Sequence, residues 1–386
     1  MGSNHKTAFV KDRLDFLENN GLYRRLRTVV ARGPTALVDG NEVINLCSND
    51  YLGLSTNKQV KDETIAALHE ISQCSSRLIA GNHPKIAQLE DLLARHRRTG
   101  SALVYPTGYT ANLGVLTTIA DRNWTIYSDE LNHASIVDAC RLSDATIVVF
   151  RHNDTEHLKE LMGCSRGRKI VITEGVFSMD GDIGKLTEIQ SIADCYGAIT
   201  IVDDAHGDFI FGPNCSGTPA KLGVNCDIHL SSMSKGLGCF GGYVATAFPI
   251  RELLINASRE FIYTSALPVH LCVAAITAIE IAKGGCLQER LRWNILYLST
   301  GLIRLGFEIG NSATHIIPII IGSEAQAVEF SDELLKEGVF SQAIRYPTVK
   351  RGQARLRISL TALHNQEHLD SALAAFERVG KKIGII

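Results

Sequence analysis

The feature that most constrains the fold is a series of short apolar runs between residues 101 and 247, separated by stretches with helical spacing. Several runs are apolar at successive positions rather than alternating ones, which is typical of strands covered on both faces. The runs expected to form strands are A-L-V-Y, W-T-I-Y, T-I-V-V-F, K-I-V-I-T, A-I-T-I-V-D, I-H-L and Y-V-A. Strands that alternate with helices in this way predict an α/β protein with a mainly parallel sheet.

The segments on either side of this series predict helices and a second lobe. Apolar residues recur at helical spacing in residues 60–69 and 85–96 before it, and in residues 268–283 and 287–305 after it. Beyond residue 307 the pattern changes to an apolar strand, I-I-P-I-I-I, a short helix, a strand pair around Ala343 and Leu356, and a last helix. This tail predicts a small α+β lobe.

The length of the chain supports more than one lobe. Its 386 residues exceed the roughly 250–300 residues that a single core usually reaches. We expect an N-terminal arm with a helix and small strands (1–50), a large domain (51–290) and a small C-terminal domain (291–386).

Charge and composition limit the classes of partner. Thirty-nine Lys and Arg against forty-one Asp and Glu leave a formal charge of −2, so no global field attracts nucleic acid or an anionic membrane. The first ten residues lack the apolar run of a secretory signal, and no 18-residue apolar stretch occurs. Ten scattered cysteines form no C-x-x-C pair, which indicates reduced thiols and no metal site. We expect a cytoplasmic protein that binds small molecules.

Two acidic residues and a histidine follow one of the expected strands. The segment A-I-T-I-V-D-D-A-H-G ends a buried run with Asp203, Asp204 and His206. In open α/β sheets, ligands bind outside the carboxyl ends of the strands. A carboxylate at that place can pair with a cationic ring nitrogen, and pyridoxal phosphate (PLP) needs such a partner to act as an electron sink.

The segment S-S-M-S-K-G-L-G follows the next expected strand and offers a lysine. Lys235 has hydroxyls directly before it and glycines directly after it, and Ser232 and Ser234 could bind a phosphate. A desolvated lysine loses its proton more readily and becomes a nucleophile that forms an imine. Alone, Lys235 is more commonly a surface lysine and Asp203 a capping residue, but their order and spacing together favour a PLP site.

Two further motifs supply an anion site and an aromatic face. In Y-P-T-G-Y-T-A-N a strand runs into a helix, whose first amides at Gly108 and Tyr109 suit a phosphate. In S-D-E-L-N-H-A-S, His133 begins a helix after a strand, where its imidazole can stack on a pyridine ring. Each motif alone is weak, because many α/β proteins have the first, and a lone histidine more commonly caps a helix.

Over nearly its whole length the chain resembles the α-oxoamine synthases, a family of PLP fold-type I enzymes. The resemblance implies a mainly parallel seven-stranded sheet in the large domain and a smaller α+β C-terminal domain. It rests on S-N-D-Y-L-G-L (48–54), S-S-R-L-I-A-G (75–81), N-H-A-S-I (132–136), T-E-G-V-F-S-M-D-G-D (173–182), V-D-D-A-H-G (202–207), S-M-S-K-G (232–236), Y-T-S-A-L-P (263–268) and A-R-L-R-I-S-L (354–360). The chain departs from the family at Gln73 and Cys74 and at residues 213–216.

The resemblance assigns roles to individual residues. Lys235 forms the Schiff base with PLP, Asp203 pairs with the ring nitrogen, and His133 stacks on the ring. Ser178 and His206 lie near the ring hydroxyl. The residues implied near the phosphate are Gly108, Tyr109 and Ser232. Those implied in catalysis are Lys235, His133, Asp203 and His206.

The resemblance also assigns substrate contacts. Arg357 holds the carboxylate of the amino acid, for which a guanidinium has matching planar geometry. Arg24, Asn49 and Thr348 border the substrate. Ser265 counts among the cofactor contacts and lies in a segment that reaches the site of a neighbouring subunit. A homodimer follows from the family.

The implied reaction joins an amino acid to an acyl thioester with loss of carbon dioxide. The segments at 21–27 and 343–349 are most similar to the family member of the biotin pathway, which uses L-alanine and a pimeloyl thioester on CoA or on a carrier protein. The alternatives are transfer of an acetyl group to glycine, another amino acid and acyl-CoA pair, or a PLP lyase or aminotransferase. A non-catalytic partner subunit is a further alternative, against which the presence of Lys235 argues.

Overall fold

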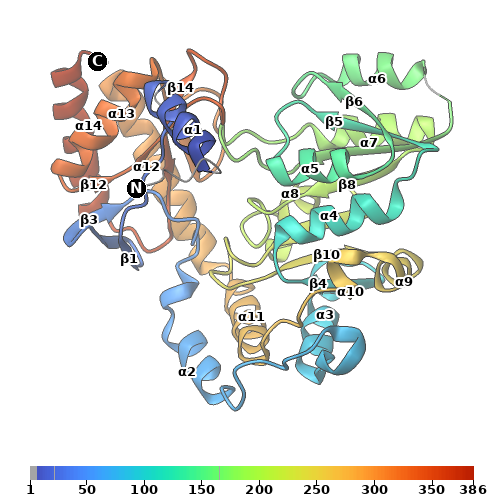
Figure 1. Ribbon diagram of the computed structural model, residues 1–386. Helices are drawn as coiled ribbons and strands as arrows, with labels where there is room; N and C mark the ends of the chain where they lie inside the picture. The colour runs from blue at the N-terminus through green and yellow to red at the C-terminus, as the bar shows by residue number, and fades with distance from the viewer. Residues whose placement is uncertain (1–6, 21, 165) are drawn as a thin grey trace.

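The computed structural model describes residues 7–20, 22–164 and 166–386. Residues 1–6, which belong to the expected N-terminal arm, lie outside this description, as do residues 21 and 165. Two lobes lie side by side in Figure 1, with the large sheet on the right and the C-terminal helices on the left.

The large lobe is built on a seven-stranded sheet. The antiparallel strand β10 lies between β4 and β9, and the other neighbouring strands are parallel. In spatial order the strands are β4 (Ser101–Tyr105), β10 (Gly242–Thr246), β9 (Ile228–Ser232), β8 (Ile199–Asp203), β7 (Arg168–Glu174), β5 (Trp124–Asp129) and β6 (Thr146–Phe150). The mainly parallel seven-stranded sheet predicted from the sequence is therefore confirmed.

Helices cover both faces of this sheet, as the uninterrupted apolar runs require. In β7, Ile170 and Ile172 pack into one apolar cluster with helices of one face, and Val171 packs into a second cluster on the other face. The first cluster includes residues of α4 (Gly108–Ile119), α5 (Ala134–Leu142), α9 (Phe248–Ala257) and α10 (Arg259–Ile262), and the second those of α6 (Thr155–Gly163) and α7 (Leu186–Tyr196).

Four helices occur where helical spacing predicted them. They are α2 (Lys58–Ala66), α3 (Pro84–Arg97), α11 (Val269–Ala282) and α12 (Cys286–Leu305). Helix α11 packs against α2 and α3. Helix α12 runs on into the C-terminal lobe, so the expected domain boundary after residue 290 falls inside it. The short helix α8 (Gly217–Lys221) follows β8.

The C-terminal lobe combines a small antiparallel sheet with helices. Its strands are β11 (Ile316–Gly322), β14 (Ala354–Ser359) and β13 (Gln342–Ile344), and its helices are α13 (Glu324–Lys336) and α14 (Gln366–Ile383). Helix α14 begins at a capping box on Asn365 and ends at Gly384, which has a left-handed conformation. Its inward residues Leu369 and Phe376 are fully buried.

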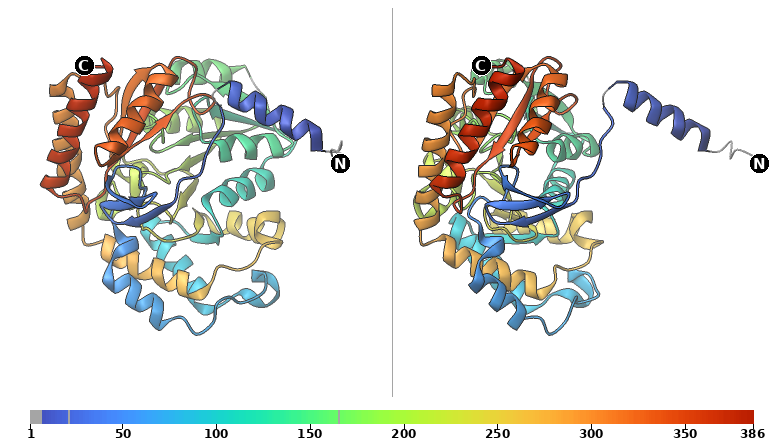
Figure 2. Two further views of the ribbon diagram at one scale, coloured as in Figure 1. Left: turned by 60° about the vertical axis from the view of Figure 1, so that its left-hand side comes forward. Right: turned by 90° about the vertical axis from the view of Figure 1, so that its left-hand side faces the viewer.

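The N-terminal strands join the C-terminal lobe. They are β1 (Val29–Arg32), β2 (Thr35–Val38) and β3 (Asn41–Asn45), and β3 pairs in parallel with β12 (Val339–Phe340). Helix α1 (Ala8–Asn19) projects away from the body, as the right-hand view of Figure 2 shows.

The structure bears on three other sequence expectations. All ten cysteines belong to the described part of the chain and are free thiols. Among the described residues, no single helix has the length and apolar character needed to cross a bilayer, and only the bent pair α11 and α12 meets both criteria jointly. The same residues contain no group of three or more side chains placed to hold a metal ion.

Candidate active site

A cavity of about 190 Å³ opens where the carboxyl ends of β7, β8 and β9 meet the N-terminus of α4. Seven of the residues predicted to form the site line it: Gly108, Tyr109, His133, Asp203, Ser232, Ser234 and Lys235. A larger and more open hollow of about 690 Å³ lies between the N-terminal arm and α13. None of the predicted site residues that the structure describes lines that hollow, so the smaller cavity is the candidate active site.

The start of α4 forms one wall of the cavity and suits an anion. Thr107 caps the helix, because its hydroxyl accepts the backbone N–H of Thr110 at 3.1 Å. The first N–H groups of a helix have no acceptor within the helix, so those of Gly108 and Tyr109 can bind a phosphate. Strand β10 approaches this turn closely, since a Cβ on Gly242 would lie 2.4 Å from the backbone nitrogen of Gly108.

The serines before Lys235 lie opposite this turn. The hydroxyls of Ser232 and Ser234 are 2.7 Å apart, and both residues line the cavity. A Cβ on Gly108 would meet the Cβ of Ser232 at 3.2 Å. Backbone amides and hydroxyls therefore converge on one end of the cavity.

Asp203, the last residue of β8, is held in a fixed orientation. One carboxylate oxygen accepts the side-chain amide of Asn112 at 2.7 Å, and the other accepts the backbone N–H of Ala205 at 3.0 Å. The amide of Asn112 also donates to Ser135 at 3.0 Å. These contacts keep a buried carboxylate aimed at the cavity, where it can pair with a cation.

Lys235 meets His206 rather than a carboxylate. Its Nζ lies 2.9 Å from Nε2 of His206, and Nδ1 of His206 lies 2.6 Å from the hydroxyl of Tyr51. Burial lowers the pKa of Lys235 and lowers the pKa of His206 well below its usual value. One tautomer satisfies every contact: Nδ1–H donates to Tyr51, the Tyr51 hydroxyl donates to Asn49 at 3.0 Å, and Nε2 accepts from Lys235.

Arg357 on β14 lies at the other end of this hydrogen-bonded chain. Its guanidinium donates to the carbonyl of Ser178 at 2.5 Å, to the hydroxyl of Ser359 at 2.6 Å and to Asn49 at 3.2 Å. The residue is 9% exposed, and no carboxylate of the described residues forms an ion pair with it. A buried cation without a counter-ion favours the binding of an anion.

His133 caps a helix, one of the two roles weighed for it from the sequence, and its ring also lines the cavity. Its Nδ1 accepts the backbone N–H of Ser135 at 3.2 Å and caps α5, and its ring lines the cavity. Burial lowers the pKa of His133. Its backbone N–H donates to Glu174 at 2.5 Å. Burial, together with the charge of Asp203, raises the pKa of Glu174 well above its usual value.

A buried ion network anchors the loop that carries Asp203 and His206. Arg97 contacts Asp204 at 3.1 Å and Asp208 at 3.2 Å, and His96 contacts Asp208 at 3.0 Å. Burial raises the pKa of Asp204 to about 6 in spite of Arg97. Burial also acts to raise the pKa of Asp208, but Arg97 and His96 outweigh it and lower that pKa to about 2. Asp204 therefore stabilises this loop and does not itself line the cavity.

Three predicted contacts lie away from the cavity of this chain. Ser265 is exposed beside a separate crevice, Arg24 is exposed on the N-terminal arm, and Thr348 is exposed on the loop between β13 and β14. The arm lies next to that loop, since Arg345 donates to the carbonyl of Tyr23 at 3.2 Å. Ser178 contributes its carbonyl to Arg357 and does not line the cavity.

Three functional residues were not singled out from the sequence: Tyr51, Asn112 and Glu174. Each belongs to a motif that was recognised, namely S-N-D-Y-L-G-L, Y-P-T-G-Y-T-A-N and T-E-G-V-F-S-M-D-G-D. Their positions within those motifs were the available signal. Their roles depend on contacts across more than one element, such as the pairing of Asn112 with Asp203.

Comparisons with known proteins agree with this geometry. A family model described as aminotransferase class I and II matches residues 41–376. An 8-amino-7-oxononanoate synthase from Thermoanaerobacter pseudethanolicus is 42% identical over 100% of both chains. A solved serine palmitoyltransferase variant from S. paucimobilis with a bound PLP–myriocin aldimine is 30% identical, with a TM-score of 0.93 over 100% of both chains.

A solved 8-amino-7-oxononanoate synthase from Francisella tularensis is also similar. It is 27% identical, with a TM-score of 0.77, over 89% of this chain and 99% of that one. The chain belongs to the aminotransferase class I and II family, with the α/β fold of PLP fold-type I proteins. Within that class, its relatives place it among the α-oxoamine synthases.

Proposed function

We propose that this protein condenses L-alanine with pimeloyl-CoA, or with a pimeloyl carrier protein, to give 8-amino-7-oxononanoate, the free thiol and carbon dioxide in biotin synthesis. The observation that carries the reaction type is the hydrogen-bonded series from Lys235 through His206 and Tyr51 to Arg357. It joins a lysine of lowered pKa to a buried cation without a counter-ion. Full-length curated relatives with the name 8-amino-7-oxononanoate synthase support this choice of substrates.

The donor set of the cavity fits PLP as the cofactor. The turn at Gly108 and the hydroxyl of Ser232 suit the phosphate, Asp203 suits the ring nitrogen, and His133 suits the ring face. Asn112 supports the fit, because its Oδ1 is buried beside the cavity without a hydrogen-bond partner among the described groups. When bound, PLP supplies an electron sink that makes the α-proton of an amino acid acidic.

The side chains of the chain divide the remaining work. Arg357 binds the substrate carboxylate and fixes which α-bond faces Lys235. Burial lowers the pKa of Lys235 and so favours the neutral amine, whose Nζ can accept the α-proton. His206 then accepts a hydrogen bond from that amine. Because Nδ1 of His133 accepts from Ser135, the proton of its neutral ring is on Nε2, where it can donate to the acyl oxygen.

A second candidate is condensation of L-serine with a long-chain acyl-CoA. Solved serine palmitoyltransferases match this chain with TM-scores of 0.93 over its whole length, above the 0.77 of the solved 8-amino-7-oxononanoate synthase. Overall shape does not separate the two reactions. The greater sequence identity of the curated 8-amino-7-oxononanoate synthases favours alanine and the pimeloyl group.

The proposal includes a homodimer in the cytoplasm. Ser265 lies on the surface and outside the cavity of its own chain, which is the placement expected of a residue that serves the site of a neighbouring subunit. Helix α1 projects from the body with exposed apolar side chains such as Phe9 and Phe16, and a second subunit can cover them.

The proposal is tested by thiol release from PLP-loaded protein. Alanine, glycine and serine are each combined with pimeloyl-CoA, acetyl-CoA and palmitoyl-CoA, and a pimeloyl carrier protein forms a further arm. We expect thiol release with alanine and a pimeloyl thioester only. Thiol release with serine and palmitoyl-CoA would instead support the second candidate function. Formation of a keto acid without any thioester would indicate an aminotransferase.

A further inference from the structure

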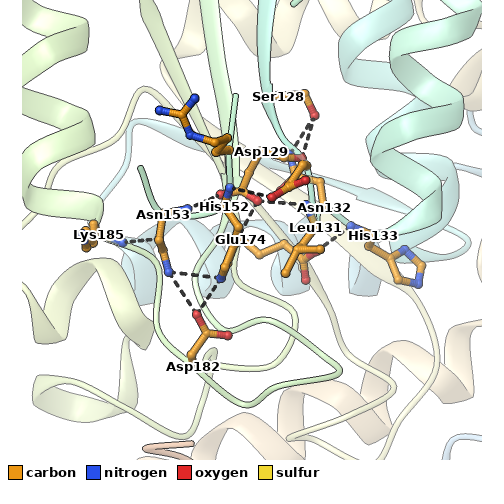
Figure 3. A network of polar contacts seen from close by, with 12 residues as sticks. Ser128, Asp129, Leu131, Asn132, His133, His152, Asn153, Glu174, Asp182 and Lys185 are labelled. Carbon is orange, nitrogen blue, oxygen red and sulfur yellow. Dashed lines mark hydrogen bonds and ion pairs between the residues drawn. The ribbon is translucent and has the colours of Figure 1, made fainter. Parts of the chain in front are cut away.

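A second cluster of polar side chains lies next to the cavity, between the loop after β5 and the loop after β7. His152 stands at its centre, with Asp129 and Asp182 on opposite sides of its ring (Figure 3). Nδ1 lies 2.9 Å from an oxygen of Asp129, and Nε2 lies 2.8 Å from an oxygen of Asp182. An ionised carboxylate only accepts hydrogen bonds, so both ring nitrogens carry protons and His152 is an imidazolium.

Asp129, at the end of β5, organises the loop that carries His133. It is 1% exposed, and it accepts the backbone N–H of Leu131 at 2.9 Å and of Asn153 at 3.0 Å. Asn132 then ties the loop to the sheet by donating to the carbonyl of Ile172 at 2.9 Å. His133 is the next residue. The imidazolium therefore neutralises the carboxylate around which this loop turns.

Asp182 belongs to the loop that carries Ser178. The carbonyl of Ser178 accepts from Arg357 at 2.5 Å. The same loop contacts the C-terminal lobe at Gly181, whose carbonyl accepts the hydroxyl of Thr314 at 2.9 Å. A Cβ on Gly181 would lie 2.0 Å from the carbonyl oxygen of Ile316, so the fit is close. Displacement of this loop would move the groups around Arg357.

The charges around His152 support its protonation. Burial acts to lower the pKa of His152, but the hydrogen bonds to Asp129 and Asp182 and their charges outweigh it and raise that pKa to about 10. Its backbone N–H donates to Glu130, which in turn pairs with Lys350. Other neighbours include Phe177, whose ring centroid lies 4.4 Å from that of the imidazole in a T-shaped arrangement, and Asn153, which also donates to Asp182.

We propose that His152 is a positioning residue that clamps the His133 loop to the Ser178 loop and thereby holds His133 and Arg357 in place for the amino acid. This inference rests on the proposed function, because it assigns Arg357 to the substrate carboxylate. His152 itself does not line the cavity. Its effect on the reaction is exerted through the two loops.

Kinetics of the PLP-loaded His152→Gln variant test the positioning role. Glutamine carries its N–H donors on one atom, so it can donate to only one of the two carboxylates, and it has no charge. We expect the KM for alanine to rise about tenfold or more, while the KM for the thioester changes less than twofold, since a displaced carboxylate clamp weakens amino-acid binding. His69→Gln is the matched control, because His69 is exposed beyond the end of α2, a helix that packs against α11. An unchanged KM for alanine would overturn the proposal.

Stability of the cofactor-free protein tests the charge on His152 independently of activity. The pKa is raised in the folded state from about 6.5 to about 10. The stabilisation it supplies is therefore complete below pH 6.5 and is lost as the pH rises towards 10. We expect the difference in Tm between wild type and His152→Gln to be largest at pH 6 and to shrink steadily up to pH 10. A pH-independent difference would overturn the clamp.

If His152→Gln does not fold, a second variant, Asp182→Asn, tests the same contact. Asp182→Asn keeps the shape of the side chain and removes the charge, so it should also raise the KM for alanine, by a smaller factor.

The proposed function and this inference can fail separately. If wild type releases no thiol with any substrate pair, the proposed function is wrong while the Tm series still decides the clamp. If wild type is active and both variants keep its KM values, the clamp alone is wrong.

Discussion

Lys235 is set apart from the other lysines by its surroundings. Its Nζ meets the neutral His206 at 2.9 Å, and burial lowers its pKa. Replacing it by alanine removes the only imine-forming group at the cavity among the described lining residues. We expect Lys235→Ala to lose at least about 10³-fold in kcat/KM and the imine absorbance of the cofactor. Steady-state kinetics and absorption spectra measure both, with exposed Lys283→Ala as the control; full activity in Lys235→Ala would refute the role.

Arg357 shows why a guanidinium differs from an ammonium at the same position. Its nitrogens contact Ser178, Ser359 and Asn49 in three directions, which a lysine cannot reproduce. We expect Arg357→Lys to raise the KM for alanine by about 10–100-fold and to leave the KM for the thioester within about threefold. The control is Arg378→Lys, an exposed arginine on α14 that pairs with Glu337. Equal changes in both KM values would show that Arg357 serves the fold and not the carboxylate.

At this scale the sequence predicted the groups whose chemistry is rare and missed those that position them. Lys235, Asp203 and His133 were recognised because a lysine, a carboxylate and an imidazole at strand ends have specific uses, and all three line one cavity. Tyr51 and His152 were missed, because their importance comes from partners 155 and 30 residues away in the chain. Such pairs become visible only when the sheet brings distant loops together.

At the scale of elements, the close approach of β10 to the start of α4 has a measurable consequence. A Cβ on Gly242 would lie 2.4 Å from the nitrogen of Gly108 and from the carbonyl of Thr107. We expect Gly242→Ala to destabilise the protein by about 1–3 kcal/mol and to weaken PLP binding, because the turn that suits the phosphate must shift. Urea unfolding of the cofactor-free protein and PLP titration measure the two effects.

The control for Gly242→Ala is a glycine with room for a methyl group. Around Gly100, just before β4, the nearest heavy atom to an added Cβ is at 3.6 Å. We expect Gly100→Ala to leave PLP affinity unchanged and to alter stability by less than about 1 kcal/mol. If Gly242→Ala behaves in the same way, the start of α4 does not form the phosphate site.

Elements with local signals were predicted well, and elements defined by distant pairing were not. The seven apolar runs became β4 to β10, because continuous burial leaves a continuous apolar pattern. The parallel pairing of β3 with β12 joins Ile44 to Val339 and has no local signature. This pairing makes the N-terminal strands part of the C-terminal lobe. The domain division expected from the sequence, with a boundary after residue 50, did not include this arrangement.

At the scale of the whole molecule, exposed apolar side chains gather around the segment that carries Ser265. Ile79 is 82% exposed and Tyr263 is 72% exposed, and both line a shallow crevice with Ser265. Large apolar side chains that cluster at a surface mark protein interaction sites. In the proposed dimer this patch meets the second subunit and brings Ser265 to its cavity.

A charge placed in this patch should therefore separate the subunits and reduce activity together. Light scattering should give wild type a mass of twice the 42.1 kDa chain. In a two-fold interface Ile79→Asp occurs twice, and the loss of about 1.5–3 kcal/mol per buried isoleucine weakens association by roughly 10²–10⁴-fold. Thiol release should fall with the dimer fraction as the variant is diluted. Ile303→Asp, the same substitution at an exposed position of α12, should leave mass and activity unchanged. A fully active monomer of Ile79→Asp would show that each chain holds a complete site and that Ser265 has no part in its neighbour's.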